Sequence, residues 1–242
     1  MKYAKGEMLY EGKAKKMFAV VLSDDLIWVE YKDSLTAFNA QKKSSFVGKG
    51  AVNCQITTLL YKKLEASGVH THLLESVNDH ELVCRKVRVI PLEVVTRNRL
   101  AGSTAKKLGK EEGTPLPGPL VEFYYKDDAL ADPFVSDDQA LFMQAAASKA
   151  ELDELRAGAL KVNNVLQGVF LSAGMELIDF KLEFGRDGKG QLLLADEISP
   201  DTCRLWDTKT GEKLDKDRFR RDLDRIEESY KEVLTRLKGV LK

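Results

Sequence analysis

The stretch LIDFKLEF, residues 177–184, alternates apolar and charged side chains over most of its length. A period of two is typical of a β-strand, in which successive side chains point to opposite faces of the sheet. One face would carry the apolar residues Ile178, Phe180, Leu182 and Phe184, and the other the charged residues Asp179, Lys181 and Glu183. The apolar face predicts packing against a core. The charged face is then either solvated or part of a binding site.

A second strand follows this one closely. The segment GRDGKG offers two possible tight turns, after which QLLLA leads to Asp196. A two-residue turn at Asp187-Gly188 would place Asp196 opposite Asp179. A turn at Lys189-Gly190 would place it opposite Glu183 instead. The two registers differ by a whole number of side-chain repeats, so both predict that Asp196 shares the charged face.

The charged face of this hairpin would hold three carboxylates and one lysine. As bare structure it is poorly balanced, because like charges that face one another repel. A divalent cation would resolve the imbalance, since Mg²⁺ at nucleotide sites is commonly held by one or two carboxylates together with phosphate oxygens and water. The plain alternative is an exposed face with surface ion pairs worth about 0–1 kcal/mol each. The polar run after the hairpin favours a site; it contains Ser199, Asp201, Arg204 and Asp207.

The composition argues against several classes of protein. Lys plus Arg and Asp plus Glu are both 38, so the net charge is zero, whereas a dedicated nucleic-acid binder is usually strongly basic. The start of the chain has no apolar signal region and no run of apolar residues is long enough for a membrane span, so neither secretion nor membrane insertion is expected. The three cysteines lack CxxC spacing, and neither disulfides nor a zinc site are expected. We therefore expect a cytoplasmic globular protein.

The rest of the chain predicts a mixture of strands and helices. Short apolar runs between turn residues over the first thirty positions predict an antiparallel β-rich lobe, and LVCRKVRVIPLEVV predicts strands that connect it to the next lobe. The segment KEEGTPLPGP, residues 110–119, holds three of the six prolines and predicts a loop. Helices are predicted over about 47–64 with a cap at Gly68, from Ser136 or Asp137 to Ala147, over about 151–172 with a stop at Gly174, and from Phe219 to Leu241. The whole predicts an α+β protein of two lobes.

A basic turn lies near the N-terminus, in the segment YEGKAKKMF. It places one glycine and three lysines between two predicted strands. A glycine lets the backbone approach a phosphate, and Lys13 and Lys15 could neutralise the phosphate charge. The segment has neither the GxxxxGK[ST] nor the GxGxxG pattern. Taken alone, it is also compatible with a solvated basic turn.

Taken together, these stretches resemble the SAICAR synthetase family (phosphoribosylaminoimidazole-succinocarboxamide synthase) over nearly the whole chain. The stretches that carry the resemblance are, in order, YEGKAKKMF, DSLTAFN, VGKGAVNCQITTLLYKKLEASGVHTH, PLEVVTRNRLAGS, EFYYKDDALADP, IDFKLEFG and LADEISPDTCRLWD. The most specific are RNRLAGS, EFYYKDDALADP and ADEISPDTCRLWD.

The resemblance implies an ATP-dependent ligase of purine biosynthesis. Such an enzyme joins 4-carboxy-5-aminoimidazole ribonucleotide (CAIR) to L-aspartate and releases SAICAR, ADP and phosphate, with Mg²⁺ at the nucleotide. The family fold is related to protein kinases and ATP-grasp enzymes. It implies a small antiparallel β-rich N-terminal lobe, residues 1–86, and a larger α+β lobe, residues 87–242. A cytoplasmic homodimer that binds small molecules, and neither nucleic acid nor membrane, is the corresponding expectation.

The resemblance also implies roles for individual residues. Lys181, Glu183 and Asp196 fall on the catalytic positions, and Glu183 and Asp196 among them on the metal-associated carboxylates. The positions implied for ATP are the loop residues Lys13, Ala14 and Lys15, the lobe connection Val87, Arg88 and Val89, and Lys126. The positions implied for the ribonucleotide are Arg97, Ser103, Asp201 and Arg204. One departure is Asn39, where other members carry Asp.

The chemistry of the implied reaction suits these residue types. A carboxylate acylates poorly until a phosphoryl group converts one oxygen into a leaving group. Phosphoryl transfer requires in-line positioning and neutralised phosphate charge, which lysines and Mg²⁺ supply. Two alternatives remain: a kinase-like phosphotransferase of small molecules, although the chain lacks HRD and DFG, and a non-catalytic nucleotide sensor, which would not need the residues implied for the ribonucleotide.

Overall fold

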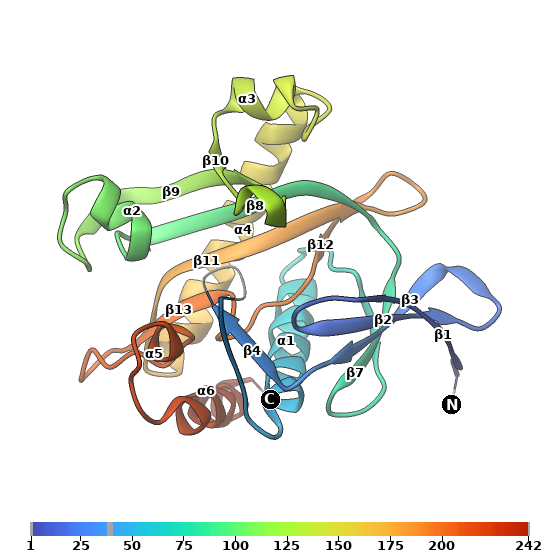
Figure 1. Ribbon diagram of the computed structural model, residues 1–242, viewed down its shortest axis with the longest axis horizontal. Helices are drawn as coiled ribbons and strands as arrows, with labels where there is room; N and C mark the ends of the chain where they lie inside the picture. The colour runs from blue at the N-terminus through green and yellow to red at the C-terminus, as the bar shows by residue number, and fades with distance from the viewer. Residues whose placement is uncertain (1, 38–40, 242) are drawn as a thin grey trace.

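The computed structural model describes residues 2–37 and 41–241. Its strands form two main sheets in which all paired strands run antiparallel, and helices pack beside them (Figure 1). Asn39 lies outside the described residues. No helix in the described ranges is both long and apolar enough to cross a membrane.

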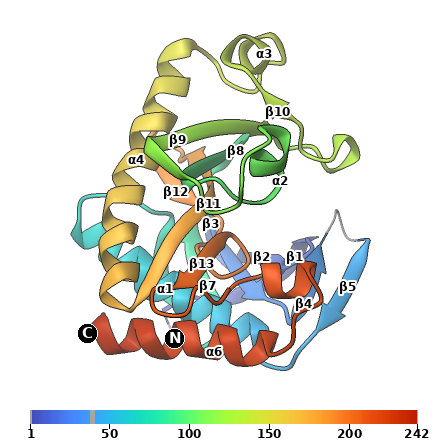
Figure 2. The same ribbon diagram turned by 90° about the vertical axis from the view of Figure 1, so that its left-hand side faces the viewer.

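The first sheet has five strands in the order β1-β2-β3-β7-β6. Their bounds are β1 Lys5–Glu11, β2 Lys15–Val20, β3 Ser23–Tyr31, β6 Leu73–Ser76 and β7 Glu81–Arg85. Short apolar runs separated by turns produce the consecutive antiparallel strands β1, β2 and β3, so the predicted antiparallel β-rich structure of the first thirty residues is confirmed. A separate hairpin of β4, Ser34–Ala37, and β5, Lys42–Ser45, stands beside it (Figure 2).

The second sheet has six strands, with β11 at its centre. Its bounds are β8 Arg88–Arg99, β9 Pro115–Tyr125, β10 Phe134–Val135, β11 Met175–Arg186, β12 Leu192–Ala195 and β13 Cys203–Asp207. One edge of β11 pairs with β8, and its other edge pairs with β13 in the first half and with β12 in the second half. The long strand therefore has partners on both sides along most of its length, and its side chains are buried except at a few intermediate positions.

The helices pack beside the two sheets. Their bounds are α1 Lys49–Ala66, α2 Gly102–Lys107, α3 Asp137–Phe142, α4 Lys149–Ser172, α5 Asp217–Arg220 and α6 Ile226–Val240, with a short 3₁₀ turn at Asp128–Leu130. Helix α4 covers one face of the six-stranded sheet, and α1 lies between α6 and the first sheet (Figures 1 and 2). Residues from α1, α4, α6 and the second sheet form one continuous apolar core.

Three predictions of local structure need correction. The loop predicted over 110–119 ends early, because β9 begins at Pro115. A strand can hold alternate prolines there because, among the described strands, β10 pairs with β9 only at Phe123 and Tyr124, so the outer edge of this part needs no N–H donors. The alanine-rich helix α3 ends at Phe142 although its predicted Ser136 cap is present. The C-terminal helix is broken in two between Arg220 and Ile226.

Candidate active site

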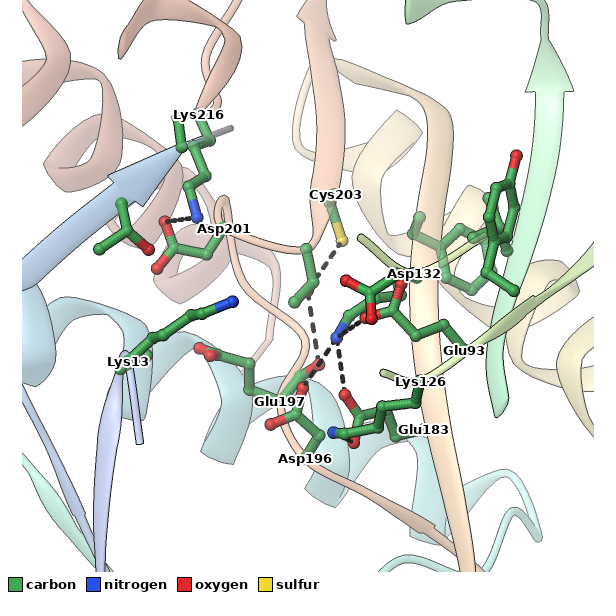
Figure 3. Close-up of a pocket in the computed structure, with 18 of the residues that line it drawn as sticks. Lys13, Glu93, Lys126, Asp132, Glu183, Asp196, Glu197, Asp201, Cys203 and Lys216 are labelled. Carbon is green, nitrogen blue, oxygen red and sulfur yellow. Dashed lines mark hydrogen bonds and ion pairs between the residues drawn. The ribbon is translucent and has the colours of Figure 1, made fainter. Parts of the chain in front are cut away.

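A cavity of about 850 Å³ lies between the two sheets. Its walls come from the β1–β2 turn, the hairpin strand β4, strands β8, β9 and β11, and the segment that follows β12 (Figure 3). Of the residues that the sequence predicts for the site, eleven line this cavity: Lys13, Ala14, Lys15, Arg97, Ser103, Lys126, Lys181, Glu183, Asp196, Asp201 and Arg204.

The predicted connection between the lobes does not line this cavity. Val87 joins β7 to β8, and Arg88 and Val89 begin β8 opposite Arg186 and Gly185 of β11. Val87 packs closely against Gly185, where an added Cβ would approach the Val87 side chain within 2.7 Å. The three residues do link the first sheet to the second, but contact with adenine stays a prediction.

An arginine cluster is built around Asp179 at one part of the cavity. Asp179 lies in β11 with Arg97 of β8 directly opposite on one side and Arg204 of β13 directly opposite on the other. Its carboxylate accepts hydrogen bonds from Arg97 Nη1 at 2.6 Å and from Arg204 Nη1 at 2.8 and 3.0 Å. Asp179 is 3% exposed, so these charged hydrogen bonds are shielded from water. One acid therefore fixes both guanidinium groups.

Other acids hold the far sides of the two arginines. Arg97 Nε donates to Glu122 at 2.7 Å and its Nη2 donates to the Tyr124 hydroxyl at 3.2 Å. Arg204 Nε donates to Asp217 at 3.0 Å. Burial would lower the pKa of Arg204, but the neighbouring acids, Asp179 first, raise it well above its usual value. Both arginines are thus permanently charged and held in fixed positions.

A second cluster, the acid–lysine cluster, joins carboxylates on β11, on β8 and at the end of β12 to lysines of β11, of the start of β2 and of the segment after β9. Lys181 Nζ lies 2.7 Å from Glu183 Oε1, 2.9 Å from Glu93 Oε1 and 3.6 Å from Asp196 Oδ2. The other ion pairs of the cluster are Lys126 with Glu183, Lys15 with Asp196, and Lys15 with Glu197 at 3.0 Å. Four carboxylates and three ammonium groups leave this cluster one negative charge in excess.

The charges of this cluster are fixed by one another. Burial alone would raise the pKa of Asp196, but Lys15, Lys181 and Lys126 hold it well below its usual value. Burial would lower the pKa of Lys15 and Lys181, and the surrounding carboxylates raise both instead. At neutral pH the carboxylate of Asp196 and the two ammonium groups are therefore ionised.

The hairpin that brings Asp196 into this cluster uses neither of the predicted two-residue turns. Glu183 lies opposite Ala195, and the loop holds three residues, Gly188 to Gly190, with Gly190 at φ 82°. In this register Asp196 would point away from Glu183 if the strand continued. It does not, because Asp196 leaves β12 with φ 62° and turns its carboxylate back toward Lys181. The Asp196 carboxylate does lie on the charged face beside Lys181, but the backbone turn at Asp196 puts it there and strand pairing does not. Both predicted registers are wrong.

The basic turn joins β1 to β2, as the sequence predicts. Gly12 N donates to Lys15 O at 2.8 Å, and this bond closes the turn. Lys13 reaches across the cavity to Asp128, where its Nζ lies 2.7 Å from Oδ1. Lys15 points inward and is 6% exposed. The two lysines therefore point to different parts of the cavity: Lys13 lies at its rim and Lys15 in the acid–lysine cluster.

Asp201 belongs to a third, largely structural network. Its Oδ2 accepts from Lys49 at 2.5 Å and from Asn53 at 3.0 Å, and its Oδ1 accepts from the Tyr230 hydroxyl at 2.8 Å. These partners come from α1 and α6. Lys216 lies farther from it, at 4.0 Å (Figure 3). Asp201 lines the cavity but already binds three protein groups.

Sequence reasoning missed several side chains of the cavity. Asp179 was placed on the charged face without a role, and Glu93, Glu197, Lys216 and Arg220 were not singled out. Glu93 alternates with apolar residues in PLEVV, which is a signal of the same kind as the one that identified Lys181 and Glu183. The other three lie in irregular or very short elements, where no period marks the direction of a side chain.

Two sheets with a cavity between them that is lined by fixed lysines, arginines and carboxylates are the architecture of an enzyme that acts on small charged substrates. Residues 8–237 match the family described as SAICAR synthetase. The phosphoribosylaminoimidazole-succinocarboxamide synthase of Wolinella succinogenes is 52% identical over 233 residues, which cover 96% of this chain and 98% of that protein. The protein of the same name from Bacillus cytotoxicus is 53% identical over 233 residues, covering 96% and 97%. The chain belongs to the SAICAR synthetase family.

Two solved structures agree with this assignment. The synthase from Ehrlichia chaffeensis is 44% identical in sequence and superimposes with a TM-score of 0.93. The match covers 98% of this chain and 100% of the other. A SAICAR synthetase in complex with ADP is 45% identical in sequence and has a TM-score of 0.92. The match covers 98% of this chain and 99% of the other. The predicted two-lobed α+β fold is therefore confirmed.

Proposed function

We propose that this single cavity carries the whole ligase reaction of the family. The protein joins CAIR and L-aspartate to SAICAR at the expense of ATP, which becomes ADP and phosphate. The observation that carries the proposal is the union of three features in one cavity: the basic β1–β2 turn, the acid–lysine cluster and the arginine cluster. A kinase or a nucleotide sensor would need the first two and has no use for the third.

ATP would bind between the basic turn and the acid–lysine cluster. Lys13, Lys15 and Lys126 would neutralise its phosphates, and the related SAICAR synthetase in complex with ADP supports a nucleotide at this family's site. Phosphoryl transfer spreads negative charge over the oxygens of the moving group, so buried Lys15, which its carboxylate partners hold in place, would stabilise it without reorganisation, and the more exposed Lys13 and Lys126 would add positive charge.

The acid–lysine cluster also has the chemistry to hold Mg²⁺. No group of three or more His, Cys, Asp or Glu side chains within residues 2–37 and 41–241 is arranged as a metal site by itself. Glu183 and Asp196 nevertheless offer hard oxygen ligands, and buried Glu197 Oε2 has no hydrogen-bond partner among the described residues. The cluster is negative in excess, and Lys126, which is 43% exposed, can leave Glu183 without cost to the core. Mg²⁺ held there with phosphate oxygens would neutralise the charge of the transferred group.

CAIR would bind at the arginine cluster. It carries a phosphate and a carboxylate, and the planar forks of Arg97 and Arg204 suit such anions, with Ser103 beside them. Docked there, its reacting carboxylate can lie toward the acid–lysine cluster, because Asp179 and Lys181 stand on the same face of β11, two residues apart. Asp201 would position the neighbouring wall of the site through its bonds to α1 and α6.

Two further features are part of this proposal. Residues 1–86 and 87–242 would form the two lobes, which is supported by the division of the strands between two sheets at Arg85 and Arg88. The protein would act in the cytoplasm as a homodimer on small-molecule substrates, without nucleic acid or membrane as partner.

Replacing Lys13 with Ala is expected to weaken ATP binding about five- to thirtyfold, the effect of losing 1–2 kcal/mol from a charged contact. The affinity for CAIR should change little. Isothermal titration of each ligand measures both. Lys16→Ala is the matched control, because Lys16 lies in the adjoining strand β2, pairs weakly with Glu30 at 3.9 Å and does not line the cavity. An equal loss of affinity for both ligands in Lys13→Ala would contradict the phosphate contact.

A further inference from the structure

Gly102 is the first residue of α2, three positions after β8 ends at Arg99, and it directly precedes Ser103 of the site. Its backbone has φ +58°, in the left-handed region that favours glycine. It also lies directly against the arginine cluster. A Cβ added to Gly102 would lie 2.5 Å from Arg204 Nη2, 2.9 Å from Cζ and 3.3 Å from Nη1. The Arg204 guanidinium therefore occupies the space that a side chain at position 102 would need.

The guanidinium of Arg204 is otherwise held from the opposite directions. Its Nε donates to Asp217 and its Nη1 donates to Asp179. Its Nη2 has no hydrogen bond to any described residue. Nη2, the nitrogen closest to Gly102, is thus the one whose donors remain for a ligand.

We propose that Gly102 is a positioning residue for the ribonucleotide, acting through Arg204. Because it has no side chain, it lets the Nη2 end of the guanidinium approach the start of α2 while both acids stay bound, and Nη2 is left for an anionic oxygen of the substrate. The inference rests on the proposed role of Arg204. It adds that the amino acid at position 102 decides whether this arginine can serve the substrate at all.

Any side chain at position 102 is expected to displace the Arg204 side chain and to leave the backbone in place. The atoms that a Cβ meets belong to the end of a flexible side chain, which can rotate away, whereas the backbone just before Gly102 is held by the hydrogen bonds of Leu100 with Thr114 and Gly113. Rotation of Arg204 would break its bonds to Asp179 and Asp217. The damage is therefore expected in substrate binding, beyond the ordinary strain of a left-handed alanine.

Gly102→Ala and Gly109→Ala form a matched pair that separates contact from strain. Gly109, at the other end of α2, has φ +61°, and a Cβ there would meet nothing within 4 Å. Both variants should lose a few degrees of Tm from the left-handed alanine, and Gly102→Ala should lose more than Gly109→Ala because its Cβ also parts Arg204 from Asp179 and Asp217. Only Gly102→Ala should raise the Kd for CAIR, by at least tenfold, the loss expected for a charged hydrogen bond. The Kd for ATP should stay within about twofold in both.

Combining Gly102→Ala with Arg204→Lys tests the route of the effect. A lysine has no planar fork for the Cβ to displace, so Gly102→Ala should add less than about twofold to the CAIR Kd in that background. Fully additive losses would overturn the inference, since Gly102 would then act by another route, such as Ser103. Equal CAIR Kd values in Gly102→Ala and Gly109→Ala would overturn it as well.

The same set of variants tells this inference apart from the proposed function. An unchanged CAIR Kd in Arg204→Lys would remove Arg204 from the site, and the proposed position of CAIR would fall together with the inference. A weakened Arg204→Lys with an unaffected Gly102→Ala would sink only the inference. If Gly102→Ala fails to fold, rescue of folding by Arg204→Lys supports the contact, and failure in both backgrounds contradicts it.

Discussion

Glu183→Gln is expected to reduce turnover at least a hundredfold while the protein remains folded. The variant removes one anionic oxygen ligand from the proposed Mg²⁺ position, where the metal contributes several kcal/mol to stabilising the transferred phosphoryl group. Folding should survive because Lys181 keeps Glu93 and Asp196 as partners, and Lys126 can turn into solvent. Asp196→Asn should behave in the same way.

Steady-state turnover over a range of Mg²⁺ concentrations checks this expectation, with Tm as the test of folding. Glu176→Gln is the matched control. It makes the same change on the same strand, but its partner Arg99 lies at the surface and Glu176 is 40% exposed. Activity of Glu183→Gln within about threefold of the wild type at low Mg²⁺ would contradict the metal assignment.

Asp179→Asn is expected to damage both stability and substrate binding. The carboxylate is buried between two arginines, and removing one partner of a buried ion pair typically costs about 3–5 kcal/mol. At about 2–4 °C per kcal/mol for a chain of this size, the Tm should fall by roughly 10 °C. The KM for CAIR should rise more than the KM for ATP, because both guanidinium groups lose the acid that orients them.

Thermal unfolding and initial rates measure the two effects of Asp179→Asn. Glu176→Gln again serves as the control, since a surface ion pair is worth about 0–1 kcal/mol. A Tm drop no larger than that of the control would mean that Asp179 does not hold the arginines. A normal Tm with a raised KM for both substrates alike would point away from a specific CAIR site.

The central strand could be predicted from the sequence because apolar and charged side chains alternate along it although it is buried. β11 is covered on both edges and still alternates between the apolar core and the acid–lysine face. The same reasoning failed at the hairpin, where a third loop residue shifted the register by one and the left-handed backbone of Asp196 restored the direction of its carboxylate. A single backbone angle of this kind leaves no periodic signal.

The arginine cluster shows why part of the site depends on the fold. Asp179, Arg97 and Arg204 come from three separate regions of sequence and meet only because β11 pairs with β8 and β13 at the same residue. Asp217 joins them from the short helix α5. Likewise, α1 and α6 supply partners for both oxygens of Asp201, which the sequence does not indicate, and its predicted contact with the ribonucleotide stays a prediction. Contacts between distant segments decide which polar groups remain for a ligand.

In the proposed reaction, one cavity couples the conversion of ATP to ADP and phosphate to the joining of two acidic substrates. ADP release by the wild-type protein, with Mg²⁺ and ATP present and with CAIR and L-aspartate added singly and together, tests it most directly. The account predicts rapid ADP release only when both substrates are present, with SAICAR formed in equal amount. Equally fast ADP release without L-aspartate or without CAIR, or no release under any condition, would contradict it.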